Sequence, residues 1–290
     1  MGKGEQDVTK LCEEFGKILD STSSFENGVC LATRSRTNLK PTVLGRRADS
    51  FMYIPQAFSF ENLDSQGRAL CLGETVILES EINPFLTRLR KHGIIVTAIH
   101  NHWLFDEPRL MYMHFESIDQ PLSFAKKVRD ALRVLTSREI VVPRKTKHTN
   151  KNQSKLCDTF SEILDGDMHT FENGQCIVMR ARNNIRPVVL GRRGQSFLLV
   201  PQMFTFESMT KDGKALCAGE TVILEDEINP FISKLREHNI IVTAVHNHWL
   251  FDDPRLMYMH FVKIDEPLHF AEDVSDALKV LTDAIVQGSK

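Results

Sequence analysis

The chain is a tandem duplication of one domain-sized sequence. Residues 11–135 align with residues 156–281, with an offset of 145 positions at the start and 146 from the Phe-Glu-Asn-Gly turn onward. A period of this length indicates a duplicated domain and not the short unit of a solenoid. The duplication therefore predicts two domains of one fold, at residues 1–142 and 156–290, joined by a polar and basic linker at residues 143–155.

Composition places the chain among globular proteins and argues against two classes of partner. Of its 290 residues, 42% are hydrophobic and 26% are charged, with a formal net charge of −2. A nucleic-acid-binding surface needs an excess of basic residues, and a membrane-spanning helix needs about 20 consecutive apolar residues. The sequence has neither feature, so we expect neither nucleic acid nor a membrane as its partner.

The six cysteines occupy equivalent positions in the two copies, and none forms a Cys-x-x-Cys motif. Four of them lie within apolar runs, where a free thiol packs as a small hydrophobic group. The N-terminus is polar and lacks the apolar core of a signal peptide. These features predict reduced cysteines and a cytoplasmic location.

Hydrophobic periodicity predicts the same order of elements in both copies. In the first copy the expected helices are Val8–Leu19, a helix beginning near Glu79 and ending at Gly93, and Pro121–Leu135. The expected strands are Val29–Arg36, Pro41–Leu44, Ser50–Ile54, Ala69–Leu78, Ile94–Trp103 and Leu110–Ile118. Each repeat is thus predicted to be an α+β domain, a mostly antiparallel sheet with two or three helices, and the two repeats to be related by pseudo-two-fold symmetry.

One sixteen-residue segment is almost identical in the two copies. It runs from His100 to Phe115 and again from His246 to Phe261, and the two differ only where Glu107 becomes Asp253. Each copy contains a His-x-His pair followed by a third histidine twelve residues later. These histidines are His100, His102 and His114 in the first copy, and His246, His248 and His260 in the second.

The segment is predicted to form a β-hairpin that gathers its histidines on one face. Side chains alternate along a strand, so His100 and His102 should point the same way as Ile94, Val96 and Ala98. If Leu104 pairs with Leu110, His100 lies directly across from His114.

Three imidazoles at that spacing can bind one divalent metal ion and leave a fourth position open, as in catalytic zinc sites. Zinc is the first expectation, and iron, manganese, nickel or cobalt also accept imidazole ligands. The alternative is that the histidines simply pack in the core or on the surface of the hairpin.

The same residues carry a resemblance. The segment Ile95–His102, the return Pro108–His114 and the upstream segment Glu81–Pro84 resemble a bacterial family of unknown function named for the mycobacterial lipoproteins LppY and LpqO. The resemblance covers nearly all of both copies, but this chain lacks the signal peptide and lipobox of the lipoprotein members. The spacing of the histidines is also loosely similar to the zinc-binding hairpin of acetolactate decarboxylase, which is an analogy of sites only.

Other repeated residues are candidates for the chemistry around such an ion. Glu81 and Glu227 could move protons as general bases, or could instead complement a helix N-terminus. Arg36 and Arg182 could clamp an anionic group, although arginines on strands more often face solvent. Trp103 and Trp249 could wall a substrate pocket or serve as packing anchors. Glu74 and Glu220, within apolar strands, are expected to face solvent.

These features allow three functions. The first is a metalloenzyme of lyase or hydrolase type acting on a small anionic molecule. The second is a non-catalytic metal-binding or ligand-binding protein or sensor. The third is a scaffold in which the histidines only pack. The identity of the substrate cannot be read from the sequence.

Overall fold

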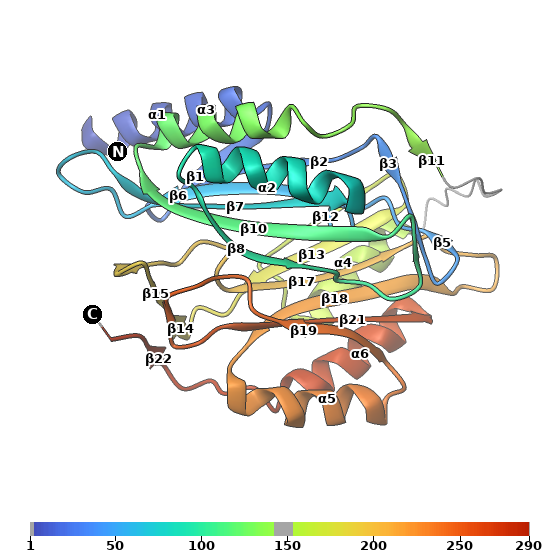
Figure 1. The fold of residues 1–290 in the computed structure, drawn as a ribbon. Helices are drawn as coiled ribbons and strands as arrows, with labels where there is room; N and C mark the ends of the chain where they lie inside the picture. The colour runs from blue at the N-terminus through green and yellow to red at the C-terminus, as the bar shows by residue number, and fades with distance from the viewer. Residues whose placement is uncertain (1–2, 142–152, 290) are drawn as a thin grey trace.

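The computed structural model describes residues 3–141 and 153–289 and shows two similar α+β halves stacked on each other (Figure 1). In the first repeat a six-stranded antiparallel sheet has the order β1 (Thr22–Glu26), β2 (Val29–Ser35), β6 (Pro55–Glu61), β7 (Ala69–Leu78), β10 (Leu110–Asp119) and β8 (Ile95–His100). In the second repeat the order is β12 (Met168–Glu172), β13 (Gln175–Ala181), β17 (Pro201–Glu207), β18 (Ala215–Ile223), β21 (Met257–Asp265) and β19 (Ile241–His246). The fold class predicted from the sequence is confirmed.

Each repeat places its helices on the outer face of its sheet. The helices are α1 (Lys3–Leu19), α2 (Ile82–Lys91) and α3 (Pro121–Leu132) in the first repeat, and α4 (Gln153–Ile163), α5 (Ile228–Glu237) and α6 (Pro267–Leu278) in the second. No described helix is long and apolar enough to cross a membrane. Residues 142–152, which include most of the predicted linker, lie outside the described part of the chain, and residues 153–155 belong to α4.

Short strands form smaller sheets beside the main ones. In the first repeat β4 (Thr42–Val43) lies between β5 (Arg46–Arg47) and β9 (Asp106–Glu107), while β3 (Leu39–Lys40) pairs with β11 (Ile140–Val141). In the second repeat β15 (Val188–Val189) lies between β16 (Arg192–Arg193) and β20 (Asp252–Asp253), while β14 (Ile185–Arg186) pairs with β22 (Val286–Gln287). The strand β9 anchors the loop that follows the His-x-His pair.

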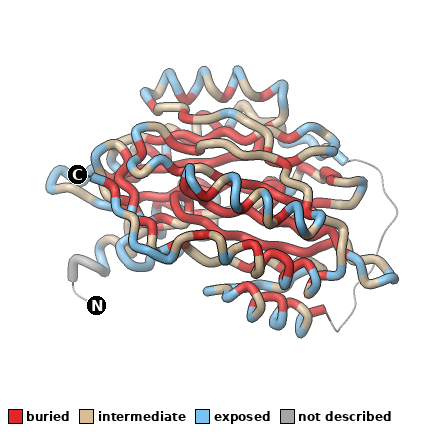
Figure 2. Tube along the Cα trace, turned by 90° about the horizontal axis from the view of Figure 1, so that it is seen from below, coloured by how far each residue is buried: buried red, intermediate tan, exposed pale blue. Residues whose placement is uncertain are grey.

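Both faces of each main sheet are buried. On the outer face, Phe15 of α1 and Phe85 of α2 pack against Phe60 and Phe115 of the sheet. The inner faces of the two sheets contribute to shared cores, one of which joins Tyr112 with Leu216 and Val262, and another Leu70 and Leu72 with Tyr258. Helices, two facing sheets and further helices thus form four layers, and buried residues line the strands and one side of the helices (Figure 2).

Three features of the sheet differ from those expected from the sequence. Thr22–Glu26, for which no strand was expected, forms the edge strand β1. Ser50–Ile54, predicted as a strand, forms turns, and the chain enters its strand only at Pro55. A proline can begin a strand because its missing N–H is not needed there. The β6 strand, Pro55–Glu61, was not predicted, although Phe58, Ser59, Phe60 and Glu61 alternate between apolar and polar residues, and all seven of its residues are buried.

Reciprocal contacts hold the two repeats together. The Glu61 carboxylate accepts hydrogen bonds from the backbone N–H groups of Gln195 (2.7 Å) and Ser196 (3.0 Å). In the mirrored contact, Glu207 accepts from the N–H groups of Asp49 (2.8 Å) and Ser50 (3.3 Å). Each repeat thereby satisfies backbone donors of a turn in the other, which fixes how the two sheets face each other.

The prediction that all cysteines are reduced is wrong. Cys12 and Cys30 form one disulfide, and Cys157 and Cys176 form the equivalent disulfide in the second repeat. Each links the first helix of its repeat to the strand beneath it. Cys71 and Cys217 are free and buried. Apolar surroundings are compatible with a disulfide as well as with a thiol, so the sequence did not distinguish the two.

Peptide mapping of the unreduced protein should recover these two disulfides, Cys12–Cys30 and Cys157–Cys176. Burial raises the pKa of the two remaining thiols far above its usual value, so they should react with an alkylating reagent only after denaturation. Alkylated Cys12 or Cys157 in denatured, unreduced protein would contradict the pairing.

Candidate metal centre

The six repeated histidines meet between the two sheets. His100 ends β8, His102 lies in the loop after it, and His114 lies within β10, with the same placement in the second repeat. Leu110, Tyr112 and His114 share a face of β10, and this is the inner face. His102, His114, His248 and His260 are almost completely buried.

The predicted register of the hairpin is wrong by two residues. Tyr112, not His114, lies opposite His100, and His114 lies opposite Ala98. A bulge follows this pair, so that Phe115 is opposite Val96 and Thr97 is left without a cross-strand partner. Because a bulge reverses the alternation of side chains, Val96 packs in the outer core, against expectation, while His100 faces inward.

The residue left unpaired by the bulge contacts the histidine loop of the other repeat. Thr97, freed from the ladder, donates a hydrogen bond from its hydroxyl to the backbone carbonyl of His248 (2.5 Å). Thr243 donates in the same way to the carbonyl of His102 (2.6 Å). Each repeat therefore helps to position the histidine loop of the other.

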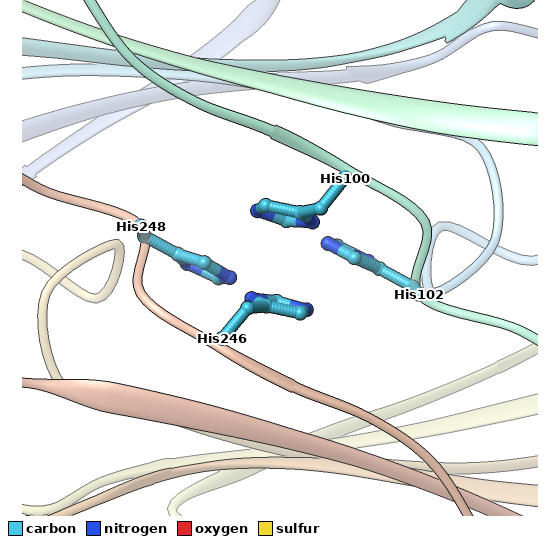
Figure 3. A group of neighbouring side chains, drawn as sticks. All are labelled: His100, His102, His246 and His248. Atoms are coloured by element: carbon cyan, nitrogen blue, oxygen red, sulfur yellow. The ribbon is translucent and has the colours of Figure 1, made fainter.

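The imidazole rings stack in pairs across the interface between the repeats. His100 lies on His246 with ring centroids 3.6 Å apart, and Figure 3 shows these two rings between His102 and His248. His102 lies on His260 (3.8 Å), and His114 lies on His248 (3.7 Å). The predicted arrangement, three histidines of one hairpin meeting by themselves, is thus replaced by one cluster shared between both hairpins.

Most nitrogens of these rings have no hydrogen-bond partner. Both ring nitrogens of His100, His114, His246 and His260, and Nε2 of His102 and His248, are buried and unpartnered among the described residues. Burial lowers the pKa of His100 to about 3. Burial also lowers the pKa of His102 well below its usual value, and the neighbouring histidines add to this effect. The rings are therefore neutral, the form that binds metal ions.

Two acids complete the cluster, although the sequence predicted that both would face solvent. Glu74 of β7 lies directly opposite His114 of β10, and Glu220 lies opposite His260, so both face the interface. They are only 8% and 6% exposed. Burial raises the pKa of Glu74 to about 8, and burial together with the charge of Glu74 raises the pKa of Glu220 well above its usual value. In the sequence, Glu74 lies two residues from Leu72 and from Val76, so it shares a strand face with these apolar residues. This spacing indicates a buried position only once the second sheet is known to cover that face.

The ligand atoms form three groups that could hold a metal ion, each with its atoms within 4.8 Å of one another. One group is Glu74, His102 and His114, and a second is its equivalent, Glu220, His248 and His260. The third contains His100, His102, His246 and His248 and links the first two, since His102 and His248 belong to both kinds of group. A zinc–nitrogen bond is about 2.0–2.1 Å long, so four ligand atoms around one ion lie roughly 3.4 Å apart, a spacing that falls within this limit.

Aromatic side chains enclose the cluster. Trp103 is fully buried, lies edge-on to His260 (5.5 Å between ring centroids), and donates a hydrogen bond from its indole N–H to the Tyr112 hydroxyl (3.0 Å). Tyr112 in turn lies flat against His102 at 3.5 Å. Trp249 lies edge-on to His114 in the same way (5.6 Å). Both tryptophans pack against the histidines, as the packing alternative expected, and neither lines the small cavity beside the centre.

A small cavity reaches the two acids. It has a volume of about 20 Å³ and is lined by Glu74, Glu220 and His248, with apolar residues of both repeats around them. A buried water needs at least about 10–15 Å³ of such space. The cavity therefore has room for about one water-sized group.

Arg36 and Glu81, predicted to bind substrate and to move protons, are bound to each other. The guanidinium donates two hydrogen bonds to the carboxylate, at 2.6 and 2.8 Å, and both side chains are buried. Glu81 also accepts from the backbone N–H groups of Leu78 and Thr136. Arg182 and Glu227 repeat the arrangement. These residues fix the start of a helix, and neither pair belongs to a candidate metal group among the described residues.

The two repeats differ at one buried acid near the centre. Glu116 is completely buried on the inner face of β10, and neither of its carboxylate oxygens has a hydrogen-bond partner among the described residues. Burial raises its pKa to about 8, and the charge of Asp252 adds to the effect. The equivalent residue in the second repeat is Val262.

Comparison with known proteins identifies the family. The model of a family described as Domain of Unknown Function (DUF1259) matches residues 13–134 and again residues 158–280. The chain belongs to this family. The two matches confirm that the DUF1259 sequence is present as a tandem duplication, and they attach no activity to it.

Other comparisons add nothing on function. No curated protein gives a significant match. The solved structures include EtuB from Clostridium kluyveri, with 8% identity over 90% of this chain and 96% of that one and a TM-score of 0.20. They also include the double-ringed trimeric shell protein MSM0271 from the RMM microcompartment, with 10% identity over 89% and 99% and a TM-score of 0.18. TM-scores this low support no conclusion about fold or function.

Replacing Glu81 by Gln should destabilise the protein by about 3–5 kcal/mol, because it leaves the buried Arg36 charge without its partner. Urea denaturation measures the change. Glu237→Gln is the control, since it breaks only the exposed pair with Lys234 and should cost less than about 1 kcal/mol. Equal effects of the two substitutions would contradict a structural role for the buried pair.

Glu116→Val, which introduces the residue of the second repeat, should stabilise the protein by about 1–3 kcal/mol at pH 8, because a buried carboxyl without partners is removed. A carboxyl whose pKa rises from 4.5 to about 8 on folding makes stability fall as the pH increases between these values. The gain should therefore be smaller at pH 5. Denaturation curves at both pH values measure it, and Val262→Glu should have the opposite effect.

Proposed function

We propose that the protein binds divalent metal ions between its two repeats. One ion is held by Glu74, His102 and His114, and the other by the equivalent residues Glu220, His248 and His260. His100 and His246 lie between the two sets and offer further nitrogens. The observation that carries the proposal is the cluster of buried imidazole nitrogens without hydrogen-bond partners.

The free energy of burying polar groups supports a metal. A buried donor or acceptor without a partner costs on the order of 1–3 kcal/mol, and this cluster contains many of them in one place. Protonation does not relieve the cost, because burial already favours the neutral rings. Metal coordination satisfies several nitrogens at once and is compatible with neutral imidazole.

The type of ligand favours zinc or iron(II). Two histidines and one carboxylate are the ligands of many catalytic zinc sites and of non-haem iron(II) sites. We retain zinc as the first expectation, with iron, manganese, nickel or cobalt as alternatives.

A second candidate is a metal-dependent enzyme of lyase or hydrolase type acting on a small anionic molecule. It is supported by the ligand groups Glu74–His102–His114 and Glu220–His248–His260, because three protein ligands leave coordination positions open. The size of the adjoining cavity, about 20 Å³, favours binding over catalysis, since only a water-sized reactant fits beside the two acids. Arg36 and Arg182, already paired with acids, cannot serve as the anion clamp.

Three further points concern the resemblance to the LppY and LpqO proteins, the likeness to acetolactate decarboxylase and the cellular location. The Thr-Ala-x-His-Asn-His core supports the resemblance to the LppY and LpqO proteins. The likeness to acetolactate decarboxylase rests on the spacing of the histidines, and the observed register and shared cluster weaken it. The expectation of a cytoplasmic location rests on reduced cysteines, and the two disulfides remove that support.

Elemental analysis of the purified full chain tests the metal centre. The wild-type protein should contain about two equivalents of transition metal, because each repeat supplies a complete set of ligands. His102→Ala should lose at least one equivalent, and the double variant with His248→Ala should lose both. Removing the metal with a chelator should lower the melting temperature of the wild-type protein.

His92→Ala is the matched control, because His92 binds Asp130 on the surface and lies outside the candidate groups. It should leave the metal content unchanged. Circular dichroism checks that each variant is folded. Wild-type protein that takes up no zinc or iron(II) after dialysis against either ion, and whose melting temperature neither ion changes, would refute the proposal.

A further inference from the structure

A large groove lies between the repeats and away from the histidines. It has a volume of about 950 Å³, and no histidine of the metal centre lines it. This volume is within the usual range of about 300–1,000 Å³ for small-molecule sites. The first repeat contributes Phe25 and Leu63 to its walls, and the second contributes Ile185 and Val200. These side chains give the groove an apolar wall.

Two arginines, Arg186 and Arg193, line the same groove. Among the described residues, neither forms an ion pair with a carboxylate. Arg193 faces the side chain of Gln287, whose oxygen, in the orientation that satisfies both groups, lies 2.9 and 3.0 Å from the guanidinium nitrogens. A neutral amide satisfies N–H donors but does not neutralise the charge.

The duplication shows that this lack of a counter-ion is specific to the second repeat. The equivalents of Arg186 and Arg193 in the first repeat are Lys40 and Arg47. Both are within ion-pairing distance of Asp49, at 4.0 and 3.9 Å. The equivalent of Asp49 is Gln195, which borders the groove. One replacement of an acid by an amide therefore leaves two cations uncompensated in the second repeat.

The carboxylate of Glu61, which also borders the groove, does not take the place of Asp49. Its oxygens accept hydrogen bonds from the backbone N–H groups of Gln195 and Ser196, and the residue is only 3% exposed. The surface of the groove thus combines two arginines and several amides with an apolar wall.

We propose that this groove binds an organic anion. Its carboxylate or phosphate head would contact Arg186 and Arg193, and its apolar body would lie against Phe25, Leu63 and Ile185. The guanidinium fork matches either head group in geometry. The inference goes beyond metal binding and does not depend on it.

Calorimetry with octanoate and octyl phosphate tests the site, and the two compounds distinguish a carboxylate from a phosphate head. At least one of them should bind the wild-type full chain, and octanol, which has the same apolar body without the charge, should bind at least tenfold more weakly. Failure of both anions to bind, or equally tight binding of octanol, would overturn the proposal.

Gln195→Asp is the decisive variant, because it restores the acid that the first repeat carries at Asp49. It should weaken binding of the anion at least tenfold. The exposed Arg186→Gln should weaken it as well, and Asp49→Gln in the first repeat is the matched control that should leave it unchanged. Binding unaffected by both groove substitutions would refute the site. The metal content of Gln195→Asp should equal that of the wild type, which separates failure here from failure of the metal centre.

Discussion

The face-to-face packing of two sheets, with six imidazoles at its centre, is the constraint on which the rest of the structure depends. The central strands of each sheet are buried on both faces, so the polar residues that they carry on the inner faces must be accommodated in the interior. The six histidines, Glu74 and Glu220 occupy that interior together. A shared metal ion would offset the cost of burying them together, which is the basis of the metal site that we propose.

Because the chain is duplicated, both repeats contribute residues to the centre. Thr97 holds the loop of His248, Thr243 holds the loop of His102, and the three closest stacked histidine pairs each join one repeat to the other. The repeats are therefore halves of one structural unit.

The two repeats differ in sequence at some equivalent positions. The core elements, the Arg36–Glu81 pair and the histidines are duplicated with little change, as the packing requires. Glu116 corresponds to a valine in the second repeat, and Asp49 corresponds to Gln195. Both differences concern a charge, one buried near the metal centre and one at the groove, so the symmetry of the fold does not extend to its electrostatics.

The sequence by itself determined the duplication, the α+β class, most helices and strands, and the six histidines as the residues that belong together. Local periodicity carries that information, because it records which residues alternate along a strand or a helix. It could not predict that Glu74 is buried, that Arg36 pairs with Glu81, or that Cys12 pairs with Cys30, since each depends on an element distant in the chain. Tertiary structure alone decided that the histidines of two hairpins form one cluster, because the facing repeat supplies the partner ring in the three closest stacked pairs, His100–His246, His102–His260 and His114–His248.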